Sequence, residues 1–346
     1  METRFPSFQR LPAADRVVIQ TQTKETIADL KKRVLEGGDI TVEEALLLSE
    51  IEDPSLIDCL CDAAHEITLA LHSNRAGLCS LINAKSYLCA EDCGFCAQSV
   101  RFETSAARYE LLTPEVIIGA AKKAETQGAQ NFCLVTSGGA LNEDEFERIL
   151  EIIKQLTQET KLGIDASLGF LDPERVERLK EAGLRRFNHN LQSSREFYPQ
   201  IVSTHDYDTR IETLEYLKEG GVELCSGGIL GMGEKREDRV KMAFELKKFS
   251  PECMPMNILN PRPGTPLENV PKLEPIEILK TIAIYRFILP KSNIKLAGGR
   301  ELNLGPYQER ALRGGANGLI VGGYLTTAAN PVKDDLEMLG RAGYKV

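Results

Sequence analysis

The first quarter of the chain carries apolar and polar residues at helical spacing. Three stretches have apolar side chains three or four positions apart: residues 24–39, 41–50 and 56–77. That period is typical of helices that bury one face. The first stretch ends at Gly37 and Gly38, and the second opens with Thr41 and Glu44, the pair that forms a capping box. We expect three helices before the first strand.

From residue 77 onward, short apolar runs alternate with amphipathic stretches. The runs predict eight strands, at residues 79–84, 131–137, 162–167, 186–191, 222–230, 254–259, 294–298 and 318–323. Helical patterns lie between them, at residues 113–128, 144–158, 172–183, 209–221, 235–249 and 274–289. Repeated strand–helix alternation predicts a parallel α/β sheet, and eight strands fit a closed barrel. An open doubly wound sheet is disfavoured, because no G-x-G-x-x-G turn follows the first strand.

The predicted organisation is a single (β/α)8 TIM-type barrel with a helical N-terminal extension. No low-complexity linker interrupts the chain. We expect the extension at residues 1–76, the barrel at 77–323, and a C-terminal segment that closes the barrel at 324–346.

Composition narrows the class of protein. The 346 residues are 42% hydrophobic and 27% charged, as in a soluble globular protein, and the net charge is -9. Without a block of Lys or Arg, neither nucleic acid nor an anionic membrane is an expected partner. No signal-peptide pattern and no run of about 18 apolar residues is present, so we expect a cytoplasmic protein.

Nine unevenly spaced cysteines predict metal binding or chemistry and not a disulfide framework. Cys89, Cys93 and Cys96 form a C-x-x-x-C-x-x-C loop directly after the first predicted strand. In a barrel, functional residues gather at that end of the strands. Cys59 and Cys61 are two positions apart in a predicted helix, cannot share a face, and are expected to be structural.

Three thiolates on one loop could hold three corners of a cubane iron–sulfur cluster or three positions around zinc. A structural zinc site normally has a fourth Cys or His, and a ferredoxin supplies a fourth cysteine nearby. Neither follows in this sequence. The loop therefore favours a cluster with one open iron that binds an exchangeable ligand, and a zinc or redox-inert loop is the alternative.

With Phe95 just before its last cysteine, the loop resembles the signature of the radical S-adenosylmethionine (SAM) enzymes. The resemblance implies a 4Fe–4S cluster held by Cys89, Cys93 and Cys96, with SAM on the fourth iron. One electron then cleaves SAM to a 5′-deoxyadenosyl radical, which abstracts hydrogen from an unactivated carbon.

Further stretches resemble the biotin synthase family: INAKS, FNHNL, VELCSGGILGMGE, MNILNPRPGTPL, LAGGRE and LTTAANP. The resemblance implies a sulfurtransferase that converts dethiobiotin to biotin in two rounds of SAM cleavage. The sulfur would come from an auxiliary iron–sulfur cluster, usually 2Fe–2S, that is consumed. It also implies a reductant such as flavodoxin or ferredoxin, and a homodimer.

Site residues follow from the resemblance, position by position. The residues expected to bind SAM are Phe95, His189, Asn190, Gln192 and Arg210, with Phe95 against the adenine and Arg210 at the methionyl carboxylate. The residues expected near dethiobiotin are Lys85, Asn190, Asn257, Thr326 and Thr327. Gln192 stands where the family usually has Asp, so it would contact the ribose without charge.

The auxiliary cluster is where the chain departs from the family, which uses three strand cysteines and an arginine. Cys133, Cys225 and Arg300 match three of these positions. The remaining cysteine position falls at Ser167, whose oxygen is a harder ligand than a thiolate.

Cys79 is the candidate replacement for the missing thiolate. It has the strand parity of Lys85, which is expected to face the barrel interior, so Cys79 should face inward and deeper. We hypothesise an auxiliary site of Cys79, Cys133 and Cys225 with Arg300 nearby, and a changed ligand set could change the number of irons. Alternatively, Cys79 is structural and Ser167 is the ligand.

Cys253 matches no ligand position and is expected to be structural, and His65, His72 and His205 are expected to be surface or packing residues. Two other functions remain open. One is a related radical SAM barrel that inserts no sulfur, and the other is an electron-transfer protein without catalysis.

Overall fold

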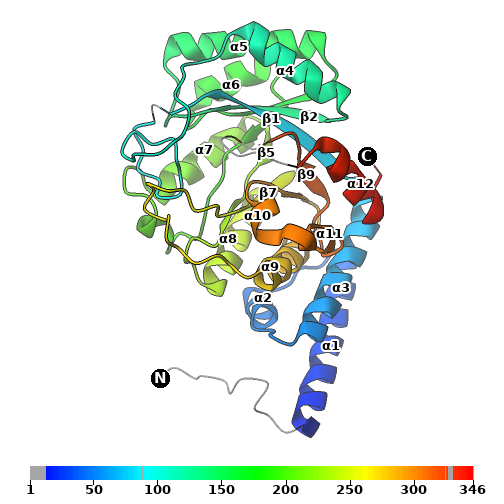
Figure 1. The fold of residues 1–346 in the computed structure, drawn as a ribbon. Coiled ribbons are helices and arrows are strands. Elements are labelled where there is room, and N and C mark those ends of the chain that lie inside the picture. The colour runs from blue at the N-terminus through cyan, green and yellow to red at the C-terminus, as the bar shows by residue number, and fades with distance from the viewer. Residues whose placement is uncertain (1–12, 88, 324, 326–329, 346) are drawn as a thin grey trace.

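The strands of the chain form a closed parallel barrel (Figure 1). The computed structural model describes residues 13–87, 89–323, 325 and 330–345. Its strands run in the order β5-β4-β3-β2-β1-β9-β8-β7-β6, and the ring closes because β5 also pairs with β7. β5 and β6 follow each other along the chain and share one place in the ring. The nine described strands therefore form a barrel with eight strand positions. The predicted fold is confirmed.

Every predicted strand is present. The strands are β1 Gly77–Lys85, β2 Asn131–Thr136, β3 Gly163–Ser167, β4 Arg186–Asn188, β5 Glu223–Cys225, β6 Gly228–Leu230, β7 Cys253–Ile258, β8 Asn293–Leu296 and β9 Gly318–Ile320. The predicted strand at 222–230 is broken at Gly227, where a Cβ would lie 2.1 Å from the Pro255 carbonyl oxygen. The backbone of β7 approaches too closely there for any side chain.

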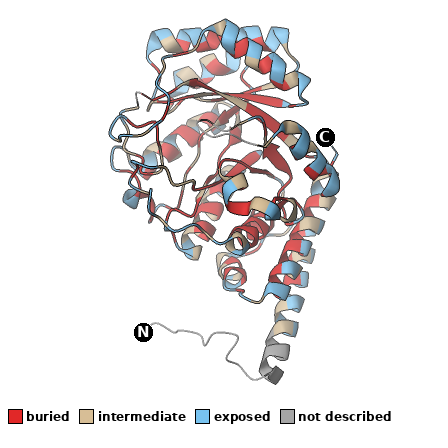
Figure 2. Cartoon of the chain, viewed as in Figure 1, coloured by how far each residue is buried: buried red, intermediate tan, exposed pale blue. Residues whose placement is uncertain are grey.

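Helices cover the outside of the ring (Figure 1). Those that follow the strands are α4 Pro114–Thr126, α5 Glu143–Glu159, α6 Pro173–Glu181, α7 Tyr207–Glu219, α8 Arg236–Phe249 and α9 Pro275–Ile288. Short elements that the sequence did not predict are η2 Tyr198–Gln200, α10 Arg300–Leu304, η3 Gly305–Tyr307, α11 Gln308–Leu312 and α12 Val332–Arg341. Figure 2 shows buried residues along the barrel and on the inward faces of these helices.

Three N-terminal helices form the predicted extension: α1 Ala13–Leu35, α2 Val42–Ser49 and α3 Pro54–His72. The capping box is confirmed, because the Glu44 backbone N–H donates to Thr41 Oγ1 and the Thr41 N–H donates to Glu44 Oε2. Helix α3 packs against α1 and α9. As a result α9 is enclosed, and residues 278–288 are all buried.

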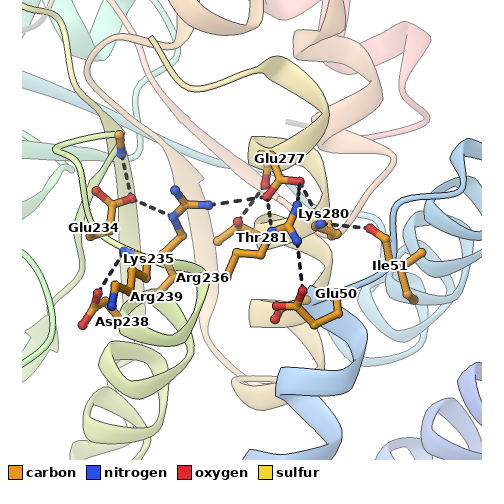
Figure 3. Close-up of polar contacts among 12 residues, drawn as sticks. Glu50, Ile51, Glu234, Lys235, Arg236, Asp238, Arg239, Glu277, Lys280 and Thr281 are labelled. Atoms are coloured by element: carbon orange, nitrogen blue, oxygen red, sulfur yellow. Dashed lines mark hydrogen bonds and ion pairs between the residues drawn. The ribbon is translucent and has the colours of Figure 1, made fainter. Parts of the chain in front are cut away.

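A network of charged side chains fixes the extension to the barrel (Figure 3). Glu277 of α9 accepts hydrogen bonds of 2.8 Å from Arg236 of α8 and from Lys280. Lys280 also donates to the Ile51 carbonyl, at 2.9 Å, and Arg236 pairs with Glu50 at 3.1 Å. The end of α2 is therefore held by two barrel helices. No helix in the described part of the chain is long and apolar enough to cross a membrane.

Candidate active site

One cavity of about 340 Å³ extends from the carboxyl ends of the strands into the barrel. Most predicted site residues line it: Cys79, Cys89, Cys93, Phe95, Cys96, Cys133, Ser167, His189, Asn190, Gln192, Arg210, Cys225 and Asn257. Lys85 and Arg300 do not. Thr326 and Thr327 lie outside the described residues. The cavity volume is within the range of small-molecule sites.

The cysteine loop at residues 89–99, here called the rim loop, lies at the upper end of this cavity. Its own backbone holds it folded, since the Cys96 N–H donates to the Cys93 carbonyl and the Val100 N–H donates to the Cys89 carbonyl, both at 2.9 Å. This arrangement turns all three cysteines toward the same cavity.

A second segment of the chain anchors the rim loop. The carboxylate of Asp92 accepts hydrogen bonds from the backbone N–H groups of Ser203 and Thr204, at 2.9 and 3.1 Å. These hydrogen bonds hold the pKa of Asp92 far below its usual range, although burial opposes the shift. The Gly94 N–H donates to the Ile201 carbonyl at 2.8 Å. The loop therefore has a fixed position relative to α7.

The thiols of the rim loop fit a 4Fe–4S cluster. Burial raises the pKa of Cys93 to about 12 and also raises that of Cys96, so these thiols stay protonated until a metal displaces the proton. Among the described residues, no three His, Cys, Asp or Glu side chains are grouped to hold a metal ion. A zinc site needs its ligands on one ion, whereas the thiolates of a cubane bind different irons.

Polar side chains next to the rim loop converge on Arg210 of α7. Its guanidinium donates to the Asn190 carbonyl and to His205 Nε2, both at 3.1 Å, and to the Tyr198 hydroxyl. His205 Nδ1 lies 2.6 Å from Glu91 Oε2. Because Nε2 accepts from Arg210, Nδ1 carries the proton and donates it to Glu91.

His205 was expected to be a surface or packing residue, and its place in the cavity wall was missed. Burial lowers the pKa of His205 and Arg210 lowers it further, against the opposite effect of Glu91, so the ring is neutral at pH 7. Glu91 and His205 are 114 residues apart. No sequence spacing could have brought them together, because only the fold places the rim loop beside the segment before α7.

The end of β4 supplies the next three predicted residues. His189 is fully buried against the Phe170 ring, with centroids 5.6 Å apart, and burial lowers its pKa well below the usual value. Asn190 Oδ1 accepts from the Gly227 N–H at 3.0 Å. Gln192 has φ +71° and pairs with Gly228. All three side chains line the cavity.

Two residues expected at the substrate already have protein partners. Asn257 donates to the Gly228 carbonyl at 3.3 Å and accepts from the Gly298 N–H at 3.1 Å, and it still lines the cavity. Lys85 forms an ion pair of 2.7 Å with Glu145 of α5. The alternation of β1 is interrupted between Asn83 and Lys85, so the assumption that Lys85 faces the interior is not supported.

The deep end of the cavity is lined by Cys79, Cys133, Asp165, Cys225 and Lys295. These five residues, together with Cys253, which pairs with Cys225 but is outside the lining, are called the barrel floor. All six are buried. Cys133 lies opposite Asp165 in the strand register, and Cys225 lies opposite Cys253. Ser167 pairs instead with Val135, nearer the rim loop. At the level of Cys133, the third strand therefore offers the Asp165 carboxylate and not Ser167.

Two cations face the barrel floor. The Lys295 side chain passes over Gly318 and Gly77. A Cβ atom on Gly318 would lie 2.7 Å from Lys295 Cγ, and a Cβ atom on Gly77 would lie 3.5 Å from Lys295 Cε. Arg186 lies 3.6 Å from Asp165, whose pKa burial raises to about 6 against the effect of Arg186. These positive charges are suited to stabilise thiolates or another anionic group in the barrel.

The floor thiols differ in acidity. Burial raises the pKa of Cys79 to about 12 and that of Cys133 well above its usual value. Cys225 and Cys253 share a hydrogen bond, which lowers the pKa of Cys253 and raises that of Cys225. Lys295 and Arg186 also lower the pKa of Cys253. The pair can therefore carry one negative charge in the protein interior.

Arg300 does not line the cavity, although its guanidinium reaches the carbonyl of Ile320, the residue paired with Cys79, at 3.4 Å. Its guanidinium donates to Asp335 Oδ2 and to Gln308 Oε1, both at 2.6 Å, and it joins α10 to α12 and α11. The expected role of Arg300 beside the auxiliary cluster is not supported by this placement. The cation that reaches the floor from this part of the chain is Lys295.

Family comparisons agree with this geometry. The radical SAM superfamily matches residues 85–246, and the Biotin and Thiamin Synthesis associated domain matches residues 255–345. The chain is 46% identical to the biotin synthase of Pelotomaculum thermopropionicum over 311 residues, which cover 90% of this chain and 97% of the relative. It is also 46% identical to that of Acetivibrio thermocellus over 319 residues, covering 92% and 98%.

Solved structures share the fold. Methylornithine synthase superimposes with a TM-score of 0.80 at 22% identity, covering 91% of this chain and 96% of that one. A maturase of the [FeFe]-hydrogenase also gives 0.80, at 16% identity, covering 99% and 80%. The sequence identity over nearly the full length decides the family: the chain belongs to the biotin synthases, within the radical SAM superfamily of enzymes.

Proposed function

We propose that this chain inserts sulfur into dethiobiotin to form biotin, with SAM as the radical source and an auxiliary iron–sulfur cluster as the sulfur donor. One observation carries the proposal: a single cavity has cysteine thiols at both ends, in the rim loop and on the barrel floor. A substrate between the two ends would face a radical source on one side and a sulfur source on the other.

Cys89, Cys93 and Cys96 would hold the 4Fe–4S cluster, which when bound supplies the electron that cleaves SAM to a hydrogen-abstracting radical. Arg210 is fixed by three protein partners, and its guanidinium suits a carboxylate such as that of the methionyl group. Phe95, His189, Asn190 and Gln192 would contact the rest of SAM. The neutral ring of His189 adds no charge next to the SAM sulfonium.

Dethiobiotin would lie deeper, between Asn190 and Asn257. Both side chains use an amide group to brace neighbouring backbone, which holds their orientation toward the cavity. Thr326 and Thr327 are proposed at the substrate carboxylate. Lys85 and Arg300 are left out of the proposal, because each is paired with a carboxylate outside the cavity.

Water and oxygen must be kept from a carbon radical, and the cavity wall supports this. Leu81, Val135, Ile229 and Ile258 contribute apolar side chains between the two ends. An apolar wall limits side reactions of a reactive intermediate.

The proposal includes a reductant such as flavodoxin or ferredoxin, a homodimer and a cytoplasmic location. All nine cysteines are free, which is in line with a reducing compartment.

The test is anaerobic. The protein is reconstituted with iron and sulfide, supplied with dithionite, SAM and dethiobiotin, and assayed for biotin and 5′-deoxyadenosine together. Biotin with deoxyadenosine is the expected result. Deoxyadenosine without biotin would favour a radical SAM enzyme that inserts no sulfur. Neither product, from protein shown to hold iron, would favour a protein without catalysis.

A further inference from the structure

We propose that Cys253 is a ligand of the auxiliary cluster, so that four cysteines, Cys79, Cys133, Cys225 and Cys253, hold it. In this arrangement Lys295 supplies charge and is not a ligand. The inference rests on the proposed function, because it assigns the ligands of the sulfur-donating site.

The strand geometry brings Cys253 to the barrel interior. Pro255 and Asn257 of β7 both line the cavity. Cys253 has their parity, so its side chain is on the inner face of the same strand, one step deeper. It is directly opposite Cys225 in the register. Two thiols from adjacent ring positions therefore meet on the floor.

The other candidate ligands are less suitable. Ser167 is one step nearer the rim loop than Asp165 and offers a hard oxygen. Asp165 also lines the cavity, but it offers a hard carboxylate oxygen, 3.6 Å from Arg186. Arg300 is paired with Asp335. Thiolates are the usual ligands of iron–sulfur clusters, and four are the usual number for both common cluster types.

Lys295 completes the site as a buried cation. Its side chain is 3% exposed, lines the same cavity as Cys79, Cys133 and Cys225, and crosses Gly318 and Gly77 on its way to the floor. Four thiolates around an iron–sulfur core leave a net negative charge, and a charge buried in a protein interior needs a partner. Each thiol releases its proton when it binds iron.

The first experiment isolates the auxiliary site. In full-length protein, Cys89→Ala, Cys93→Ala and Cys96→Ala together remove the rim-loop ligands, so all iron retained after anaerobic reconstitution belongs to the floor. Adding Cys253→Ser to this background should reduce bound iron and sulfide at least fivefold or change the Mössbauer parameters. Cys61→Ser is the matched control, because Cys61 is also buried but lies in α3, and it should change neither. Unchanged iron, sulfide and spectrum in the Cys253→Ser protein would overturn the proposal.

A second measurement needs no change at residue 253. Iron X-ray absorption fine structure of the triple variant should show sulfur as the only nearest neighbour. A nitrogen or oxygen ligand on one iron would overturn the four-cysteine set and point to Lys295, Asp165 or Ser167. The two proposals fail differently: biotin formation by the wild-type protein together with an oxygen or nitrogen ligand would reject only the four-cysteine set. A triple variant without iron, and a wild-type protein that makes no biotin, would reject both.

Discussion

The guanidinium of Arg210, in the cavity wall, forms hydrogen bonds with three different segments of the chain. It contacts η2 through Tyr198, the end of β4 through Asn190, and the segment before α7 through His205. The planar guanidinium is held in one orientation by these hydrogen bonds. A lysine at this position could make only some of them and would keep the charge without the geometry.

We therefore predict that Arg210→Lys weakens SAM binding at least tenfold, or about 1.4 kcal/mol. Equilibrium dialysis of the anaerobically reconstituted protein measures the Kd. Arg195→Lys is the control, because Arg195 is exposed and pairs with Asp208 on the surface, and it should leave the Kd unchanged. An unchanged Kd for Arg210→Lys would show that Arg210 does not hold the SAM carboxylate.

Protonation of His72, at the end of α3, makes the free energy of unfolding depend on pH. Burial and the neighbouring Arg286 lower the pKa of His72 from 6.5 to about 4. The unfolded chain binds this proton near pH 6.5 and the folded protein only near pH 4. Stability is therefore complete above pH 6.5 and falls as the pH drops toward 4. Since His72 is partly exposed, we expect about 1–2 kcal/mol from this group.

The His72→Gln variant should lose this contribution to the pH dependence. Urea midpoints at pH 7 and pH 4.5 provide the measurement, and the variant should show a smaller decrease than the wild type. If both proteins lose the same stability, His72 does not titrate as the structure indicates.

At the scale of secondary structure, the loops after β2 and β3 cross at the edge of the cavity. Gly169 has φ +88°, and a Cβ there would lie 2.1 Å from the Gly139 carbonyl oxygen. The next residue, Phe170, donates its N–H to the same carbonyl and packs on the rings of His189 and His205. The close approach of two loops therefore sets the position of an aromatic side chain at the site.

Gly169→Ala should lower the free energy of unfolding by about 2–4 kcal/mol, from backbone strain and the clash with Gly139. Gly119→Ala is the control, because nothing lies within 4 Å of a Cβ at that position in α4, and it should stabilise the protein by about 0.5–1 kcal/mol. Urea unfolding measures both. Equal effects of the two substitutions would contradict the account of the crossing loops.

The elements themselves were predictable from sequence, because each strand or helix repeats its own hydrophobic period. The short α10 and α11 were not, since five residues contain too little of a helical period. The register between neighbouring strands could not be predicted from the sequence either. The register of β1 shifts between Asn83 and Lys85, and Lys85 lies outside the cavity lining. The pairing of β2 with β3 places Asp165, and not Ser167, opposite Cys133.

The candidate site was predictable where its residues lie close together in sequence, as in the rim loop. It was not predictable where distant segments meet. Cys253 was expected to be structural, because nothing in its local sequence shows that Cys225 lies opposite. Arg300 was expected at the auxiliary cluster from the resemblance alone, and only its ion pair with Asp335 of α12 shows that Arg300 is already paired.

At the scale of the whole molecule, the N-terminal helices enclose α9 and are fixed by the network around Glu277 (Figure 3). Glu277 neutralises Arg236 and Lys280, and Lys280 is almost fully buried. Removing a partner from a buried ion pair leaves an unpaired charge, which costs more than the pair itself contributes.

Glu277→Ala should therefore lower the free energy of unfolding by about 2–3 kcal/mol and increase amide hydrogen exchange in α2. Glu159→Ala breaks the exposed pair with Lys122 and should cost at most about 1 kcal/mol. Unchanged exchange in α2 would show that apolar packing alone holds the extension.

The cysteines at the two ends of the cavity become available at different stages of translation. The rim-loop cysteines lie between positions 89 and 96, so a ribosome-bound chain carries all three thiols early. The floor cysteines come from β1, β2, β5 and β7, and Lys295 from β8. A nascent chain has all three rim-loop thiols when Cys79 is the only floor cysteine yet made, and the four proposed floor ligands are complete only after translation has passed Cys253 of β7.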